Sequence, residues 1–367
     1  MDRKSRILLG EEMVRSVFYM KKWAVAATAA LLLLSGCSDK EKVNGPKEPV
    51  EEVEEVGQEE VNNEFPYQYP LTGVGSETKT DGRAVAVMVN NHLKARPQSG
   101  LDKADIVYEI LAEGDVTRFL AVFQSETPKN IGPVRSARDY YIDLAKGLDA
   151  LFIAHGYSAE AQEMLEQDYV DNLNGMVYDG TLFKRASFRE APHNSYITYE
   201  NVLKGAKEKK YTMESSPPKF KFLSEDEDDS ITGDEAGSVM ISYSESAIFD
   251  STYEYDPAVE KYKRFSDGDQ TIDYETKEPI MVDNLFIIET AHQVIDDVGH
   301  KEIDLESGGS GYLLQKGKVM EVEWKSDNGL ILPVKNGEVV PFVQGKTWVN
   351  VVPTNPGLHS SVSFNVK

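Results

Sequence analysis

The spacing of hydrophobic residues separates the chain into two parts with different patterns. Over residues 66–222, short apolar runs alternate with stretches of helical periodicity, whereas strand and turn signals dominate over residues 238–367. In the first part, runs rich in β-branched and aromatic residues are bounded by turn-forming residues, which predicts strands. These runs are residues 84–90 (AVAVMVN), 105–113 (DIVYEILAE), 116–124 (VTRFLAVFQ) and 150–154 (ALFIA).

Three stretches of the first part have the features of helices. After Ser136, apolar residues recur with a helical period as far as Leu148, and Ser136 with Asp139 has the spacing of a capping box. Because strands alternate with helices, residues 66–222 are expected to form an α/β or α+β domain. The other two helices are predicted from Ser158 to about Gln167 and from Thr198 to Lys210.

The second part has the features of a mostly β domain, residues 238–367. Between strand-like runs, Asp256-Pro257, Lys316-Gly317 and Asn336-Gly337 predict hairpin turns. The acidic residues 223–237 that separate the two parts predict a linker. Residues 284–295 are expected to form one long strand, and residues 346–352 the last core strand.

The first 36 residues have the pattern of an export signal. Lys21 and Lys22 precede an apolar run, residues 23–34, which is followed by small residues. A spanning helix needs about 20 apolar residues, so this run is too short to remain as one. Residues 34–37, LSGC, match the bacterial lipobox, which implies cleavage before Cys37 and a diacylglycerol on its sulfur. The alternative is an ordinary signal peptide that contains a cysteine.

Residues 1–19 differ from the start of an export signal, because they include Glu11 and Glu12. Met20, followed by two lysines, is typical of a translation start. We therefore interpret residues 1–19 as a misassigned start, although the sequence leaves the true start codon open.

Charge and cysteine usage agree with a lipid-anchored protein outside the cytoplasm. Cys37 is the only cysteine in 367 residues, so a lipidated chain has neither a free thiol nor a disulfide. Residues 37–65 are strongly acidic and poor in large apolar residues, which predicts a disordered tether. The formal charge of −23 argues against a nucleic-acid partner. The expected location is the extracytoplasmic face of the cell membrane, reached through the N-terminal lipid.

Four stretches of the sequence resemble the YerB-like lipoproteins of Gram-positive bacteria, a family of unknown function with an N-terminal and a C-terminal part. The resemblance spans both predicted domains and implies an exported, membrane-anchored protein of the cell envelope. It implies no known reaction. The four stretches are residues 91–124, 131–145, 191–198 (APHNSYIT) and 345–353 (GKTWVNVVP).

Two arginines flank the start of the predicted helix after Ser136. The helix dipole disfavours cations there, so Arg135 and Arg138 need a negative partner. A bound phosphate or carboxylate is one such partner, since guanidinium groups match these anions. The alternative partner is a carboxylate of this chain, Glu109 or Glu113.

His155 adds to the hypothesis of an anion site. It follows a predicted buried strand and precedes a helix, which is where α/β sheets place ligands. We therefore expect Arg135, Ser136, Arg138 and His155 to converge on an anion. Secondary candidates for this site are Glu109, Arg118, His193 and Asn194.

Other motifs give weaker indications of chemistry. Residues 155–160, HGYSAE, approach the nucleophile elbow G-x-S-x-G, but Glu160 replaces the second glycine, which favours Ser158 as an N-cap. Residues 267–278 approach the spacing of a calcium loop, but Ile272 replaces its glycine, which favours a solvated hairpin. The six histidines are scattered, and we predict no metal and no cofactor.

Two functions are compatible with these features. The favoured one is a non-enzymatic envelope lipoprotein that binds a cell-wall synthesis protein or an anionic glycan. The alternative is an enzyme acting on a phosphorylated or carboxylated cell-wall substrate, with Arg135 and Arg138 stabilising charge and His155 moving a proton. The sequence does not identify the ligand, the partner, the catalytic residues or the oligomeric state.

Overall fold

The computed structural model describes residues 65–365. The predicted signal peptide, Cys37 and the predicted tether before residue 65 lie outside the described residues. Within residues 65–365, no helix combines the length and the apolar character that a membrane crossing requires.

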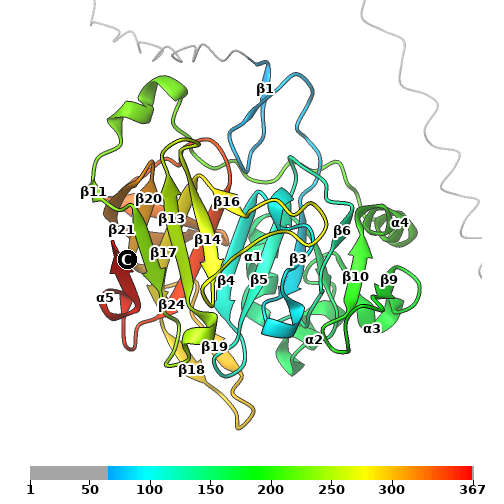
Figure 1. Ribbon diagram of the computed structural model, residues 1–367. Helices are drawn as coiled ribbons and strands as arrows, with labels where there is room; N and C mark the ends of the chain where they lie inside the picture. Colours follow the sequence, from blue (N-terminus) through cyan, green and yellow to red (C-terminus); the bar gives the residue numbers. More distant parts are fainter. Residues whose placement is uncertain (1–64, 366–367) are drawn as a thin grey trace, which may run out of the picture. The chain divides into compact units, whose positions relative to one another are not determined.

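A mixed β-sheet of twelve strands runs through the described part of the chain (Figure 1). Strands β17, β24 and β4 are parallel to one another, as are β3, β7 and β8, and the remaining pairs are antiparallel. In spatial order the strands are β23 (Glu338–Val339), β22 (Leu330–Lys335), β21 (Lys318–Asp327), β20 (Gly309–Gln315), β17 (Asn284–Thr290), β24 (Thr347–Pro353), β4 (Ile106–Leu111), β5 (Thr117–Phe123), β3 (Val85–Asn90), β7 (Leu151–Ala154) and β8 (Asn172–Asn174), with β11 (Asp234–Glu235) paired to β21.

The central strands are buried on both faces of the sheet, because other elements of the fold pack against each face. Alternate residues of β3 contribute to two different hydrophobic cores, Val85 and Val89 to one and Met88 to the other. A strand buried on both sides has a nearly continuous apolar sequence, which explains runs such as AVAVMVN.

Helices cover one face of the sheet. Tyr141 and Leu144 of α1 (Asp139–Gly147) and Leu165 of α2 (Ala159–Glu166) pack in the same core as Met88. In Figure 1, α1 is seen behind β4 and β5. The remaining helices are α3 (Gly175–Tyr178), α4 (Tyr199–Lys209) and α5 (Leu358–Ser361), with 3₁₀ helices η1 (Leu93–Ala95), η2 (Leu101–Lys103), η3 (Glu225–Ser230) and η4 (Ala247–Phe249).

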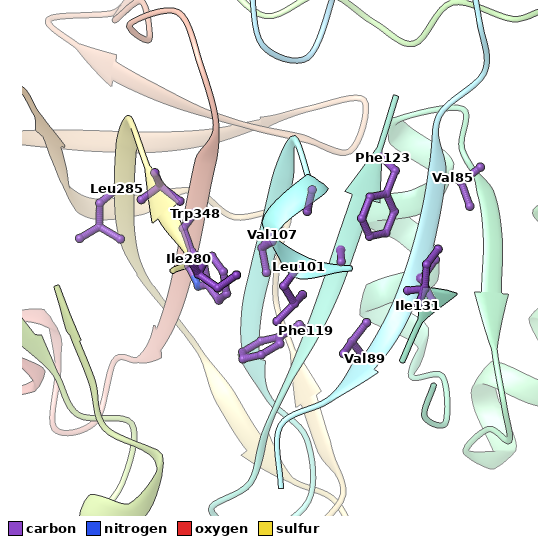
Figure 2. Packing of buried hydrophobic residues seen from close by; sticks show 14 of the residues in the cluster. Val85, Val89, Leu101, Val107, Phe119, Phe123, Ile131, Ile280, Leu285 and Trp348 are labelled. Atoms are coloured by element: carbon purple, nitrogen blue, oxygen red, sulfur yellow. The ribbon is translucent and has the colours of Figure 1, made fainter. Parts of the chain in front are cut away.

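A second, antiparallel sheet of six strands covers part of the opposite face. Its Tyr253 packs against Trp348 of β24, and Trp348 meets Phe119 of β5 edge to face with ring centres 5.1 Å apart (Figure 2). This core joins residues from both predicted domains. The strands are β15 (Asp269–Gln270), β14 (Lys261–Ser266), β13 (Ser251–Asp256), β12 (Ser238–Ile241) and β25 (Val362–Phe364), with β16 (Met281–Val282) paired to β14.

Three smaller sheets complete the described structure. The three-stranded one is important for the candidate site, because β10 carries Ser195 and follows His193. Its strands are β6 (Asn130–Ile131), β10 (Ser195–Thr198) and β9 (Phe183–Arg185), and the two-stranded sheets are β1 (Tyr67–Gln68) with β2 (Gly75–Ser76) and β18 (His292–Val294) with β19 (Lys301–Ile303).

The predicted fold class is confirmed: a mixed α/β N-terminal part precedes a mostly antiparallel β part. The predicted long strand over residues 284–295 is wrong, because β17 ends at Thr290 and β18 begins at His292. The chain changes sheet at this point, and β18 pairs only with β19 among the described strands. The predicted linker contains η3 and β11, and β11 pairs with β21.

Candidate functional site

The carboxyl ends of three parallel strands meet at one edge of the central sheet. Asn90 is the last residue of β3, His155 directly follows β7, and Asn174 ends β8. Ligands of α/β proteins bind beside such strand ends, because loops there carry side chains that the sheet need not pack. His155 thus lies between a buried strand, β7, and a helix, as the sequence predicts.

Two histidines from distant segments stack on each other near Asn90. His92 and His193 have ring centres 4.5 Å apart and nearly parallel planes. Asn90 fixes both segments, since its Oδ1 accepts from the His92 backbone N–H at 3.0 Å and its Nδ2 lies 2.9 Å from Nδ1 of His193.

These contacts assign the proton position on both rings. Nδ1 of His92 accepts from the backbone N–H of Lys94 at 3.1 Å, and Nδ1 of His193 accepts from Asn90. A neutral imidazole that accepts at Nδ1 carries its proton on Nε2. Neither Nε2 has a hydrogen-bond partner within residues 65–365, so both rings have an uncommitted N–H donor.

Arg135 acts electrostatically on both histidines. Burial lowers the pKa of His92 and of His193, and the charge of Arg135 lowers each pKa further. The backbone of Arg135 is fixed by a 2.9 Å hydrogen bond to the carbonyl of Met88. Its half-buried side chain makes no hydrogen bond or ion pair to any residue of the described range. We refer to His92, Arg135 and His193 as the His–Arg cluster.

Arg138 differs from Arg135 in that it is paired within the chain. It is buried and forms an ion pair with Glu113, whose two carboxylate oxygens also accept from Nη2 of Arg118 at 2.6 and 2.5 Å. The Arg–Glu alternative is therefore confirmed for Arg138 with Glu113. Three guanidinium groups, those of Arg118, Arg135 and Arg138, surround one carboxylate, and together they keep the pKa of Glu113 below its usual range although burial opposes them.

The predicted cap at Ser136 is wrong. Helix α1 begins at Asp139 with Arg138 as its N-cap, and no side chain provides the cap hydrogen bond. The hydroxyl of Ser136 instead donates to the carbonyl of His155 at 3.4 Å. Asp139 accepts from its own backbone N–H and that of Tyr140, so its carboxylate occupies donors that an external anion would need.

His155 is held in one tautomer by two neighbours. Its Nε2 lies 2.9 Å from Nη2 of Arg185, which can only donate, so Nδ1 carries the proton and donates to Oγ of Ser195 at 2.6 Å. Burial and the Arg185 charge both lower the pKa of His155. A ring in this state cannot take a proton from Ser195, so the pair does not have the geometry of an activated nucleophile.

The secondary candidates are distributed over three environments. Arg118 belongs to the Glu113 network and His193 to the His–Arg cluster, whereas Asn194 lies nearer the surface and accepts from Nη1 of Arg185 at 3.2 Å. Glu109 points to the other face of the sheet, where its buried carboxylate pairs with Arg264 at 2.9 Å. The structure therefore divides the predicted site. Arg118 and Arg138 pair with Glu113, and Arg135 acts on His92 and His193. His155 is bound by Arg185 and Ser195, and Glu109 lies elsewhere.

Two other sequence motifs have structural roles. Oγ of Ser158 accepts from the backbone N–H of Ala161 at 3.3 Å, which confirms Ser158 as the N-cap of α2. In the calcium-like stretch, the buried carboxylate of Asp273 accepts from the backbone N–H groups of Gly100 and Glu275. Within residues 65–365, no three metal-ligating side chains are grouped together.

His92 and Arg264 were not among the residues expected to carry function. The signal for His92 was present, since it follows a buried strand within two residues, as His155 does. No local signal exists for Arg264, which lies in a strand 155 residues from its partner Glu109.

The sequence matches a family described as a protein of unknown function (DUF3048), over residues 71–212 for its N-terminal domain and residues 239–349 for its C-terminal domain. The chain is 44% identical over 338 residues to a protein of Bacillus subtilis (strain 168) named "Putative lipoprotein YerB", which covers 91% of this chain and 96% of that protein. The crystal structure of YerB protein from Bacillus subtilis is also similar, with 46% identity and a TM-score of 0.76, over 82% of this chain and 100% of that chain.

Proposed function

Because this chain belongs to the DUF3048 family, whose function is unknown, we propose that it is a lipid-anchored binding protein of the cell envelope. The ligand is an anionic group, a phosphate or a carboxylate, bound at the His–Arg cluster. The protein acts on the extracytoplasmic face of the membrane, to which it is attached through Cys37.

The observation that carries this proposal is the sign of the charges around the two histidines. The charged groups that act on the pKa of His92 are Lys94, Arg135 and Arg96, and those acting on the pKa of His193 are His92, Arg135, Lys94 and Arg189. Apart from the neutral ring of His92, these groups are all cationic, in a chain whose formal charge is −23. A local excess of positive charge attracts anions even when the whole molecule is acidic.

The donors of the cluster also suit an anion. Arg135 supplies a guanidinium, which binds phosphate and carboxylate oxygens through two parallel N–H groups. His92 and His193 supply neutral N–H donors from stacked rings. Both histidines are neutral at pH 7 because their pKa is lowered, so they donate without adding charge.

This arrangement favours binding over catalysis. Arg138 is committed to Glu113, and His155 is committed to Arg185 and Ser195. The groups that an enzyme would use for charge stabilisation and proton transfer are thus already satisfied, whereas the donors of the His–Arg cluster are available for a ligand.

The binding site is tested by titrating full-length protein in detergent with inorganic phosphate while recording ¹⁵N–¹H spectra of the histidine rings. We expect the Nε2–H signals of His92 and His193 to shift, and Arg135→Gln to weaken binding about tenfold or more. Lys204→Gln, which removes one positive charge from an exposed site on α4, is the matched control and should bind as wild type. Equal binding by Arg135→Gln, or no shift at about 10 mM phosphate, would show that the cluster is not an anion site.

The anchor is tested separately by Cys37→Ser. A chain without the acceptor thiol should leave the membrane fraction and appear in the medium, because it has no site for the lipid. Retention of the variant in the membrane fraction, to the same extent as wild type, would disprove attachment through Cys37.

A further inference from the structure

A cavity of about 540 Å³ lies on the face of the central sheet that carries Glu109, and two of its lining residues, Asn91 and Leu93, flank His92 of the His–Arg cluster in the sequence. Its volume is within the range of sites for small molecules. The residues that line it come from the loop after β3 and from the β14–β15 hairpin with the segment that follows. They are Asn91, Leu93, Arg96, Pro97, Gln98, Arg264, Ser266, Asp267, Asp269, Gln270, Thr271 and Ile272.

Arg96 supplies a positive charge to one side of this cavity. Its Nε donates to the backbone carbonyl and to Oδ1 of Asn91, both at 3.1 Å, which fixes the guanidinium. The two terminal nitrogens reach only the carbonyl of Ile248, at 3.4 and 3.5 Å. Burial lowers the pKa of Arg96 to about 10, so the group stays charged at neutral pH.

Arg96 differs from Arg264, the other arginine of the cavity, in its partners. Arg264 also lines the cavity, but it is only 1% exposed and its charge is compensated by Glu109. Arg96 forms no ion pair within residues 65–365. Glu109 and Asp267 act on the charge of Arg96 only from beyond ion-pair distance, so its guanidinium remains open to an anionic ligand.

Two carboxylates stand on the hairpin side of the same cavity. Asp267 and Asp269 are exposed, and neither makes a salt bridge to a described residue. The two-residue turn Asp267-Gly268 has positive φ at both positions, 54° and 78°, as a type I′ hairpin requires. Asp267 acts on the pKa of Arg96, so the charges are near each other without pairing.

We propose that this cavity binds a small zwitterion with a carboxylate and an ammonium group, such as a short peptide with free ends. Arg96 binds the carboxylate, and Asp267 and Asp269 bind the ammonium. The apolar lining residues Leu93, Pro97 and Ile272 suit a short aliphatic side chain. A sugar is disfavoured because no aromatic ring lines the cavity.

The test compares three forms of one dipeptide by calorimetric titration of full-length protein in detergent. The probes are alanylalanine, N-acetyl-alanylalanine, which lacks the ammonium, and alanylalanine amide, which lacks the carboxylate. We expect each blocked form to bind about tenfold more weakly than the free dipeptide. Similar affinity for all three, no binding of the free dipeptide at about 10 mM, or tighter binding of a neutral disaccharide would each overturn the proposal.

Variants assign the two ends of the ligand. The double variant Asp267→Asn with Asp269→Asn should bind alanylalanine and its N-acetyl form equally, and Arg96→Gln should bind the free acid and the amide equally. Asp81→Asn, an exposed aspartate outside the cavity, is the control that should keep the full preference. Arg96→Gln also removes hydrogen bonds within the fold, so a loss of binding in this variant can reflect a change in folding. The double aspartate variant changes only exposed side chains and avoids this ambiguity. A double variant that still prefers the free amine would disprove the assignment.

Discussion

At the residue scale, the strongest electrostatic feature is the ion pair between Glu109 and Arg264. Both side chains are almost completely buried, and the carboxylate also receives hydrogen bonds from Thr117, Ser251 and the indole N–H of Trp348. The guanidinium lies over the rings of Phe119 and Trp348. A buried charge is costly unless it is paired and hydrogen-bonded, so the pair favours one arrangement of the strands from both parts of the chain.

Arg264→Met is expected to lower the free energy of unfolding by about 3–5 kcal/mol, because it leaves the carboxylate of Glu109 buried without a cation. Urea denaturation monitored by tryptophan fluorescence measures the loss. The control is Lys103→Ala, which breaks the solvent-exposed pair with Glu126 and should cost less than about 1 kcal/mol. Losses of similar size in both variants would mean that the Glu109–Arg264 pair contributes no more than a surface pair.

A buried histidine outside the candidate site predicts how stability depends on pH. Burial lowers the pKa of His292 from 6.5 to about 4, although its hydrogen bond to the carbonyl of Thr290 opposes the shift. The folded state therefore binds fewer protons than the unfolded chain between pH 6.5 and pH 4. Stability should fall as the pH is lowered through this interval.

The expected loss from His292 is about 3 kcal/mol on going from pH 7 to pH 4, at 1.36 kcal/mol per unit of pKa difference. Asp105 acts in the opposite direction, because burial raises its pKa to about 6. Comparing wild type with His292→Gln by urea denaturation at each pH isolates the histidine. The difference between the two proteins should change with pH, and a constant difference would contradict the prediction.

At the scale of elements, the start of α2 depends on one hydroxyl. Ser158 has extended backbone angles, and its Oγ satisfies a backbone N–H in the first turn that the helix cannot satisfy itself. The helix is eight residues long and has limited intrinsic stability, so the cap contributes measurably.

Ser158→Ala is expected to cost about 1 kcal/mol of unfolding free energy, measured by thermal or urea denaturation. Ser158→Asp should restore most of the loss, because a carboxylate caps the same N–H group and suits the helix dipole. If Ser158→Ala is as stable as wild type, or if Ser158→Asp is the less stable of the two, the hydroxyl does not act as a cap.

At the scale of the whole described structure, β24 joins the two predicted domains. It belongs to the C-terminal part and pairs in parallel with β17 on one side and with β4 of the N-terminal part on the other. Both hydrophobic cores contain residues from before and after the stretch 223–237. Whether residues 66–222 and 238–367 also fold as separate domains stays a prediction.

We expect one cooperative unfolding transition for the folded part, because separating the two parts would break the β24–β4 ladder and open both cores. Differential scanning calorimetry tests this by comparing the calorimetric enthalpy with the van't Hoff enthalpy. Two resolved transitions, with one retained when residues 66–222 are expressed alone, would instead favour independent domains.

The sequence alone determined the local features. Apolar, β-branched runs located β3, β4, β5 and β7 to within a few residues, because strands buried on both faces have nearly continuous apolar sequences. Helical periodicity located α1, and α2 and α4 were located from their predicted starts at Ser158 and Thr198. The hairpin at Asn336-Gly337 and the cap at Ser158 depend on contacts within a few residues, so they too were predictable.

Only the tertiary structure decided which charges meet. Arg135 and Arg138 are three residues apart in equivalent sequence surroundings, yet Arg138 is paired with Glu113 and Arg135 is left beside His92 and His193. Glu109 meets Arg264, and Arg96 faces Asp267, across long separations in the chain. Charge–charge interactions require that the two groups be close in space. For residues far apart in the sequence, only the assembled sheets and loops create this proximity, so no pattern within one segment predicts such pairs.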